Sequence, residues 1–415
     1  MKNLIYSAFI VLIMGSCISK NEKVYQFRGD DRSGIYQESN LLKEWPEEGL
    51  KELWSIETVG NGFCTPIFTE DRFYISGETD GETSMYCFNL AGEMQWQSTI
   101  GEEWIKSYPG SRMAPTIVGD LLYTGTGLGN LYCLNIENGE IVWSLNFEKD
   151  FAGIPMLHGY SEAPVIDGDK VFWTPGGKEF NAVGLNRFSG EILWSHPGFG
   201  ERSGYNQGQL IQLPSRNIYV TFSAYHLMGF DTETGELLWS QEQDNLPLEK
   251  RTLGMGDTHT NNVIYDNGFI YYSTADGLGG VKLSLSEDGT EIKQVWRNLS
   301  FDGLMGGMVK IGDFIYSESF SKPRLLSINA NSGVLSDSLK IGSGALLSAD
   351  NMLYYYSSRG ELMLIKFNEG KMEIVSSFKI TKGDRHHFAH PVINKSILYL
   401  RHGKVLMAFD LKAEG

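Results

Sequence analysis

The sequence has little cysteine, little basic charge and no regular helical pattern. Of its 415 residues only 4 are cysteines, and 35 lysines and arginines stand against 51 aspartates and glutamates, a formal net charge of −16. So few cysteines exclude a disulfide-rich scaffold. No basic stripe is present, so nucleic acid is not an expected partner, and the acidity keeps the molecule soluble. The missing helical period directs attention to strands and turns.

The N-terminus lacks an apolar run long enough to cross a bilayer. After a short positive start, the apolar stretch 4–14 is followed by the small pair Gly15–Ser16 and then by Cys17. This layout is that of a secretory signal. The placing of Cys17 resembles a bacterial lipobox, which implies a signal peptide over 1–16 and lipidation of Cys17. With Ile18 next to the cysteine, the resemblance implies an outer-membrane anchor on either the periplasmic or the surface side.

One phrase recurs along the chain at intervals of about fifty residues. It reads CLNIENGEIVW at 133–143, GLNRFSGEILW at 184–194 and GFDTETGELLW at 229–239. Each copy has a small residue, an Asn or Asp two places on, a glycine and a closing tryptophan. The glycine permits a tight turn, the Asn or Asp side chain can hold that turn, and the tryptophan offers a broad apolar surface.

Other copies of the phrase are looser. Cys87 and Cys133 occupy its small-residue position, so we expect them to be buried, whereas Cys64 precedes a strand and has no catalytic setting. Two late copies have lost the tryptophan, one ending at Asp337 and the other near Ser376. We therefore expect the packing seams beside those two copies to be the weakest.

Four short apolar runs accompany each phrase, separated by Gly, Asp and Ser turns. Strands at this spacing and period predict the blades of a β-propeller. The predicted blades are 62–96, 112–143, 162–194, 208–239, 260–296, 304–337, 345–377 and 390–410.

The last predicted blade lacks a closing strand, and the stretch 50–56, which contains Trp54, is a closing strand without a blade. Joining the two would remove the open sheet edges. The sequence therefore predicts an all-β fold, an eight-bladed β-propeller of four-stranded antiparallel blades closed by the N-terminal strand 50–56. Residues 17–49 would be a tether and lead-in, and residues 50–415 one propeller domain, a monomeric ring.

The spacing small-x-Asp-x-x-Thr-Gly-x-x-x-Trp resembles the tryptophan docking motif of the pyrroloquinoline quinone (PQQ)-like, or quinoprotein alcohol dehydrogenase-like, propeller repeat family. The lead-in at 27–54 is also similar to the start of bacterial PQQ-like repeat proteins, so the resemblance covers residues 27–415. It implies structural docking roles for Trp54, Trp96, Trp143, Trp194, Trp239 and Trp296. For activity it is less specific, because the family contains both dehydrogenases and cofactor-free lipoproteins of outer-membrane assembly.

In propellers the loops that lead into the innermost strands surround the mouth of the central channel. Aligning the blades gathers polar residues on blades two to five, while the other blades contribute mostly apolar or small residues. The candidate binding residues are Arg112, Tyr160, Glu162, Tyr205, Asn206, Gln207 and His259. A mouth that is polar on one side and apolar on the other suits a peptide or an amphiphilic ligand. Ordinary loop polarity around a water-filled channel is the alternative interpretation.

Evidence for catalysis is weak in the sequence. If the chain were a dehydrogenase, the resemblance implies PQQ with a calcium ion held by Glu162, Asn206 and Asp257. Their order and spacing depart from the dehydrogenase pattern, and there is no adjacent Cys-Cys pair. The histidines of DRHHFAH at 384–390 suggest a metal, but His386 and His387 are adjacent and point opposite ways in an extended segment. We expect no metal there.

These observations favour a non-catalytic scaffold, without a cofactor, that binds a protein or peptide partner in the bacterial cell envelope. Outer-membrane protein assembly is the process that the resemblance suggests. The alternative is a PQQ- and calcium-dependent dehydrogenase of alcohols or sugars. A third hypothesis, carbohydrate binding, rests on the aromatic content alone.

Overall fold

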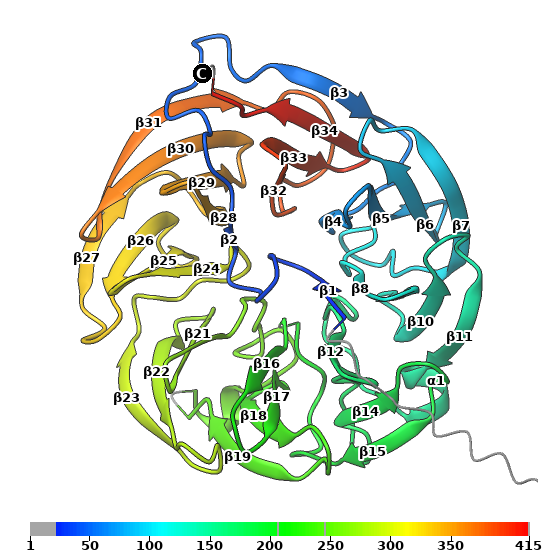
Figure 1. The fold of residues 1–415 in the computed structure, drawn as a ribbon. Helices are drawn as coiled ribbons and strands as arrows, with labels where there is room; N and C mark the ends of the chain where they lie inside the picture. The colour runs from blue at the N-terminus through cyan, green and yellow to red at the C-terminus, as the bar shows by residue number, and fades with distance from the viewer. Residues whose placement is uncertain (1–21, 206, 245, 414–415) are drawn as a thin grey trace, which may run out of the picture.

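The computed structural model describes residues 22–205, 207–244 and 246–413, and in them eight β-sheets stand in a ring (Figure 1). Successive strands pair antiparallel, as predicted, so the expectation of an eight-bladed β-propeller is confirmed. The described helical segments are the short α1 (Phe147–Phe151) and a 3₁₀ turn at Leu248–Lys250. No helix in the described part of the chain is long and apolar enough to cross a membrane.

The blades follow the chain, each running from its inner to its outer strand. Blade 1 consists of β4 (Ile67–Phe68), β5 (Arg72–Thr79), β6 (Glu82–Asn89) and β7 (Met94–Glu102), and blade 2 of β8 (Thr116–Val118), β9 (Leu121–Gly125), β10 (Asn130–Asn135) and β11 (Ile141–Asn146). Blade 3 consists of β12 (Val165–Asp167), β13 (Lys170–Trp173), β14 (Ala182–Asn186) and β15 (Ile192–His196), and blade 4 of β16 (Gln209–Gln212), β17 (Asn217–Phe222), β18 (His226–Asp231) and β19 (Leu237–Glu242). Blade 5 consists of β20 (Ile264–Asp266), β21 (Phe269–Thr274), β22 (Gly279–Leu285) and β23 (Ile292–Asn298), and blade 6 of β24 (Met308–Ile311), β25 (Phe314–Ser319), β26 (Arg324–Asn329) and β27 (Leu335–Leu339). Blade 7 consists of β28 (Gly344–Ala349), β29 (Met352–Ser357), β30 (Glu361–Asn368) and β31 (Lys371–Lys379), and blade 8 of β32 (Val392–Asn394), β33 (Ile397–His402), β34 (Val405–Asp410) and β3 (Glu52–Ile56).

The alternating strand directions give the ring two different faces. The loops that join one blade to the next, and the hairpins between second and third strands, lie on one face, which we call the mouth face. The turns between first and second strands and between third and fourth strands lie on the other, which we call the turn face. The repeated phrases therefore all lie toward the turn face.

The repeated phrase is a bulged turn into the outer strand. In blade 4 the pairing of β18 with β19 shifts between Gly229 and Phe230, and blades 1 to 7 all carry such a shift between their third and outer strands. The Oδ1 atom of Asp231 accepts hydrogen bonds from the backbone N–H of Glu233 at 3.0 Å and of Thr234 at 3.1 Å. Gly235 follows at φ 73°, a left-handed conformation that glycine adopts without strain.

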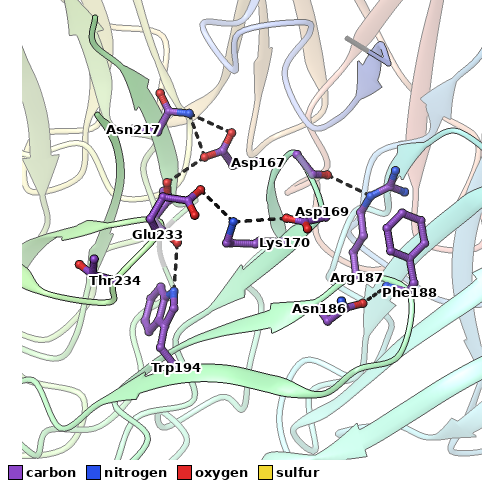
Figure 2. Close-up of polar contacts among 12 residues, drawn as sticks. Asp167, Asp169, Lys170, Asn186, Arg187, Phe188, Trp194, Asn217, Glu233 and Thr234 are labelled. Carbon is purple, nitrogen blue, oxygen red and sulfur yellow. Dashed lines mark hydrogen bonds and ion pairs between the residues drawn. The ribbon is translucent and has the colours of Figure 1, made fainter. Parts of the chain in front are cut away.

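The tryptophan of one blade docks on the phrase of the next blade. At the seam between blades 3 and 4, the indole N–H of Trp194 donates to the carbonyl oxygen of Thr232 at 3.1 Å (Figure 2). A Cβ at Gly235 would lie 2.6 Å from the Trp194 ring, so the glycine also makes room for the indole. The same indole bond joins Trp96 to Ile136, Trp143 to Arg187, Trp239 to Gly289 and Trp296 to Ala330.

The ring closes through the N-terminal strand, as the sequence predicts. β3 pairs antiparallel with β34 and becomes the outer strand of blade 8. Trp54 of β3 stacks on Phe73 of blade 1, with ring centroids 5.8 Å apart. The first and last segments of the propeller are thus held in one sheet, which leaves no gap in the ring (Figure 1).

The two seams without a docking tryptophan are filled by other residues. Between blades 6 and 7, the Oδ2 atom of Asp337 accepts a hydrogen bond from the backbone N–H of Met372 at 2.8 Å. Between blades 7 and 8, Trp45 of the lead-in packs on Phe378 at 5.6 Å, and its backbone N–H donates to Ser376. That these seams are the weakest in the ring stays a prediction.

Candidate functional site

The lead-in enters the central channel from the turn face and returns to it. The carboxylate of Glu22 pairs with Arg187, in the turn after β14, at 2.6 Å. β1 (Val24–Tyr25) then pairs antiparallel with β8 and so runs toward the mouth, whereas β2 (Ile35–Tyr36) runs parallel to β28, back toward the turn face. Figure 1 shows this segment crossing the centre of the ring. Residues 22–36 therefore form a plug whose tip lies below the mouth.

Two buried arginines fix the tip of the plug to opposite sides of the channel. Arg32 donates to backbone carbonyls at the start of blades 3 and 4, including that of Gly208 at 2.9 Å. Arg28 donates to the carbonyl of Met308 at 2.7 Å and contacts Nδ1 of His390 at 3.1 Å. Burial lowers the pKa of each guanidinium to about 10. These backbone carbonyl oxygens near the inner strands thus accept hydrogen bonds from the plug.

A cavity of about 580 Å³ opens above the plug on the mouth face, and all eight blades contribute to its wall. Phe27 of the plug is among its lining residues, which makes the cavity a dead end rather than a passage through the ring. The lining residues from the blades include Phe63, Tyr108, Arg112, Leu157, His158, Tyr205, Gln207, Thr258, Asp276, Met305, Phe320, Ser343, His387 and Phe388.

A belt of aromatic rings runs along one side of the cavity, from blade 8 to the loop before blade 4. Phe63 and Phe388 lie 5.8 Å apart by ring centroids, and Tyr108 lies 6.0 Å from Phe388. Tyr108 also meets His158 edge-on at 5.1 Å, and His158 stacks with Tyr205 at 6.3 Å. Burial, helped by the positive charge of Arg112, lowers the pKa of His158. The belt is therefore an uncharged surface suited to apolar and aromatic groups near neutral pH.

Arg112 places a positive charge in the wall beside this belt. Its guanidinium donates to the backbone carbonyl of His158 and, at 2.7 Å, to that of Tyr108. Its Nε is buried without a hydrogen-bond partner, and no carboxylate among the described residues forms an ion pair with it. Burial lowers the pKa of Arg112, against the opposing charge of Glu103. A carboxylate brought by a ligand would compensate this charge.

The structure brings part of the predicted mouth set together. Arg112, Tyr205 and Gln207 line the cavity. The Tyr205 hydroxyl accepts a hydrogen bond from the backbone N–H of His158 at 2.6 Å, and the Gln207 side chain accepts from the N–H of Ala163 at 3.1 Å. Asn206 and the predicted lipidation residue, Cys17, lie outside the described residues.

Tyr160, Glu162 and His259 do not line the cavity but are buried within the blades. The hydroxyl of Tyr160 donates to the carbonyl of Pro175 at 2.9 Å, and Nε2 of His259 donates to the carbonyl of Ala224 at 2.8 Å. Neighbouring residues of an extended segment point to opposite sides, so each of these side chains faces the blade while its neighbour faces the mouth. Their positions in the alignment of blades did not reveal which side each takes.

Glu162 is the acceptor of a buried hydrogen-bond network between blades 3 and 4. Its Oε1 accepts from the hydroxyl of Tyr219 at 2.6 Å, and its Oε2 accepts from the backbone N–H of Thr174 at 3.0 Å. Burial raises the pKa of Glu162 to about 7, because desolvation outweighs the stabilising hydrogen bonds. The carboxyl group therefore serves the seam between the blades.

The two carboxylates proposed for a PQQ and calcium site do not fit that role, and the third residue of that set, Asn206, lies outside the described residues. Both carboxylates are engaged within the protein, Glu162 as above and Asp257 with Arg202 at 2.7 Å and with the N–H of Gly254 at 3.1 Å. Neither one lines the cavity. Trp173, a possible surface for stacking on the quinone, is fully buried.

The histidines at 386–390 have separate partners. His386 stacks on Phe388, and Nδ1 of His387 contacts the hydroxyl of Tyr356. His390 lies below, where its Nε2 donates to the carbonyl of Met305 at 2.7 Å. Within the described part of the chain, no group of three or more His, Cys, Asp or Glu residues could hold a metal ion.

Tyr108 and His158 are cavity residues that the sequence did not identify, His387 was considered only as a metal ligand, and Phe63 and Phe388 were counted only as apolar positions of the mouth. The first two lie in the long connections between blades, 103–115 and 147–164, at positions before the part of each connection that the alignment of blades covers. The concentration of aromatic residues and histidines in those loops was the available signal.

Comparison with known proteins gives one family model that matches more than half of the chain. The family described as outer membrane protein assembly factor BamB matches residues 81–336. BamB of Burkholderia pseudomallei is 24% identical over 247 residues, which are 58% of this chain and 60% of that protein. BamB of Moranella endobia is 26% identical over 245 residues, 56% of each chain. The chain thus matches less than two thirds of the length of these relatives. The quinoprotein alcohol dehydrogenase PedH of Pseudomonas putida is 33% identical, but over only 93 residues, 21% of this chain and 15% of PedH.

Solved structures share the fold at low identity. BamB from Moraxella catarrhalis superimposes with a TM-score of 0.62 and 14% identity, covering 88% of this chain and 99% of that one. A europium-containing methanol dehydrogenase superimposes with a TM-score of 0.63 and 11% identity, covering 89% and 88%. BamB and a methanol dehydrogenase therefore share this ring, and the fold alone does not distinguish them.

Proposed function

The chain belongs to the family of outer membrane protein assembly factor BamB, and from this membership we propose that it is a non-catalytic scaffold that binds a protein partner during outer-membrane protein assembly. Residues 1–16 would be removed as a signal peptide, and a lipid on Cys17 would anchor the monomeric ring at the outer membrane. The BamB relatives support an envelope setting, and the contacts of Glu162 and Asp257 argue against a calcium-dependent reaction.

The observation that carries this proposal is the dead-end cavity on the mouth face. Its volume of about 580 Å³ suits a few side chains and is far too small for a folded domain. Because Phe27 and the plug close the channel below, a ligand can enter and leave only through the mouth. The partner would therefore insert a protruding loop or chain end rather than thread through the ring.

The wall chemistry indicates what such a segment contains. The aromatic belt, which includes Phe63 and Tyr108, would pack against an apolar or aromatic side chain. Arg112 would pair with a carboxylate close to that side chain. The net charge of −16 repels strongly acidic segments, so a single carboxylate in a neutral or basic segment fits best.

The test is a complementation experiment. Deletion of the gene should lower the amount of folded β-barrel protein in the outer membrane, and the wild-type chain should restore it. Arg112→Gln should restore it at least about threefold less well. Arg72→Gln, which removes the same charge from the turn face, should behave as wild type. Unchanged barrel levels after deletion would contradict the proposed function. Full rescue by Arg112→Gln would contradict the assignment of the mouth as its site.

A dehydrogenase is the second candidate, supported by the short PedH match. Calorimetric titration of the ring with PQQ and calcium distinguishes the two. We expect no saturable binding. Binding near one to one, followed by dye reduction with an alcohol or a sugar, would replace the scaffold proposal.

A further inference from the structure

We infer that the ring stands with its turn face toward the membrane and its mouth toward the aqueous side. The inference rests on the proposed lipid anchor at Cys17. It assigns the turn face to a lipid surface and leaves the mouth cavity open to partners that approach from the aqueous side.

The point at which the lead-in reaches the ring fixes the side of the anchor. Glu22 pairs with Arg187 in the turn between β14 and β15 at 2.6 Å. A Cβ at Gly119, in the turn between β8 and β9, would lie 2.9 Å from the Glu22 carboxylate. Both turns belong to the turn face, so the chain arrives there from its N-terminal side.

The length of the tether forbids the opposite orientation. Only five residue steps separate Cys17 from Glu22, and a fully extended chain spans no more than about 18 Å over that length. β10 (Asn130–Asn135), in a blade that Glu22 contacts, crosses the ring from the mouth face to the turn face in five residue steps, about 17 Å. The hairpin 126–129 and the turn 136–140 at its two ends make the ring deeper than that. A tether shorter than the ring is deep cannot bring the mouth against the lipid.

Charge on the turn face indicates what holds that face at the membrane. Glu191, Glu236 and Glu287 are exposed on its turns and form no ion pair within the described residues. An anionic lipid surface would repel them. The lipid anchor, rather than attraction to headgroups, must therefore keep the turn face near the bilayer, and a zwitterionic membrane suits it best.

The experiment uses the full lipidated chain in zwitterionic vesicles, with a fluorophore on one introduced cysteine and a nitroxide quencher on the lipid headgroups. The cysteines native to the ring, Cys64, Cys87 and Cys133, are buried and leave the introduced thiol as the reactive one. Ala91→Cys on the turn face is matched by Glu82→Cys on the mouth face of the same blade.

A second pair, Glu287→Cys on the turn face and Ser300→Cys on the mouth face, repeats the comparison in blade 5, across the ring from blade 1 (Figure 1). All four positions are exposed. We expect at least about threefold stronger quenching for the turn-face labels in both blades. Equal quenching of the two faces, or stronger quenching on the mouth face, would overturn the inference. Strong quenching of both labels in one blade and of neither in the other would also overturn it, because the ring would then lie on its side.

Flotation of the vesicles separates this inference from the function on which it rests. The wild-type chain should float with the vesicles, and Cys17→Ser, which carries no lipid, should not. If the wild-type chain fails to float, the proposed anchor itself is wrong. If it floats and the labels disagree with the expected pattern, the anchor stands and only the orientation is overturned.

Discussion

The seam between blades 3 and 4 and the seam between blades 7 and 8 are closed by residues of different origin. At the first, Trp194 of the repeat docks on the phrase that contains Gly235, so both partners come from neighbouring copies of one pattern. At the second, the repeat offers only Ser376 at the tryptophan position, and Trp45 of the lead-in covers the gap. A repeat protein can thus lose a docking residue where a segment from outside the repeat replaces it.

The replacement also links stability to the site. The same lead-in that supplies Trp45 forms the plug, whose Phe27 lines the floor of the mouth cavity. A seam made within the repeat depends on two blades alone, whereas the seam between blades 7 and 8 depends on a segment that also shapes the binding cavity.

The largest effect is expected at the lead-in seam. Trp45→Ala removes a buried indole that packs on Phe378 and Tyr354, and it should lower the free energy of unfolding by about 3–5 kcal/mol. Trp194→Ala, also at a buried position, is the matched change within the repeat and should cost a similar amount. Urea unfolding of both variants measures this. A Trp45→Ala cost below about 1 kcal/mol would mean that the lead-in does not stabilise its seam.

A pH effect is expected from Glu162, at the inner side of the seam between blades 3 and 4. Folding raises the pKa of its carboxyl group from 4.5 to about 7, because the group is buried. The contribution of Glu162 to stability is therefore greatest below pH 4.5 and falls as the pH rises from 4.5 to 7, by about 3 kcal/mol.

Glu162→Gln removes that titration. The difference in unfolding free energy between the variant and the wild type should shift in favour of the variant as the pH rises through this window. Urea unfolding at pH 4.5 and pH 7 measures the shift. A difference that is the same at both values would show that Glu162 does not titrate there.

A smaller loss of stability is expected where Gly235 lies close to the ring of Trp194. Gly235→Ala should cost about 2–3 kcal/mol, because the residue has φ 73° and the new methyl group would lie 2.6 Å from the Trp194 ring. Gly312→Ala is the control, since Gly312 has φ 54° and nothing within 4 Å of its Cβ position, and should cost about 1 kcal/mol. Equal shifts in melting temperature for the two variants would contradict a role in docking.

The smallest effect is expected between blades 6 and 7. Asp337→Ala removes the acceptor of a hydrogen bond from the backbone N–H of Met372 and should cost about 1 kcal/mol. Asp313→Ala, at an exposed turn of the same blade, is the control and should change the melting temperature by less. If Asp337→Ala lowered the free energy of unfolding as much as Trp45→Ala, one carboxylate would stabilise its seam as strongly as an indole does, which would contradict this expectation.

The fold was predictable because its information is local and repeated. The phrase around Trp143, Trp194 and Trp239 indicates the blades, and the orphan strand with Trp54 indicates how the ring closes. The role of Trp45 was not predictable, because it depends on a contact with Ser376 that lies 331 residues away in the chain. The sequence also predicts the lead-in to be a tether, whereas in the structure Arg28 is buried and donates hydrogen bonds to backbone carbonyls of the channel.

The site was predictable only in part. Aligning the blades placed Arg112 and Gln207 at the mouth, but it also placed Glu162 and His259 there. In blade 3 the residue before Glu162, Ser161, lines the cavity, whereas in blade 4 Gln207, which aligns with Glu162 itself, does so. Loops of different length change which of two neighbouring side chains points inward, and no repeat pattern reports that change.

The most direct test of the account is photo-cross-linking in cells. A photoreactive phenylalanine analogue replaces Tyr108, which lines the mouth cavity, or Ala91, which lies on the turn face. The account predicts that the label at position 108 joins the chain to one protein of outer-membrane assembly, that Arg112→Gln weakens this product, and that position 91 does not form it. The same product from position 91, with none from position 108, would contradict the mouth as the partner site.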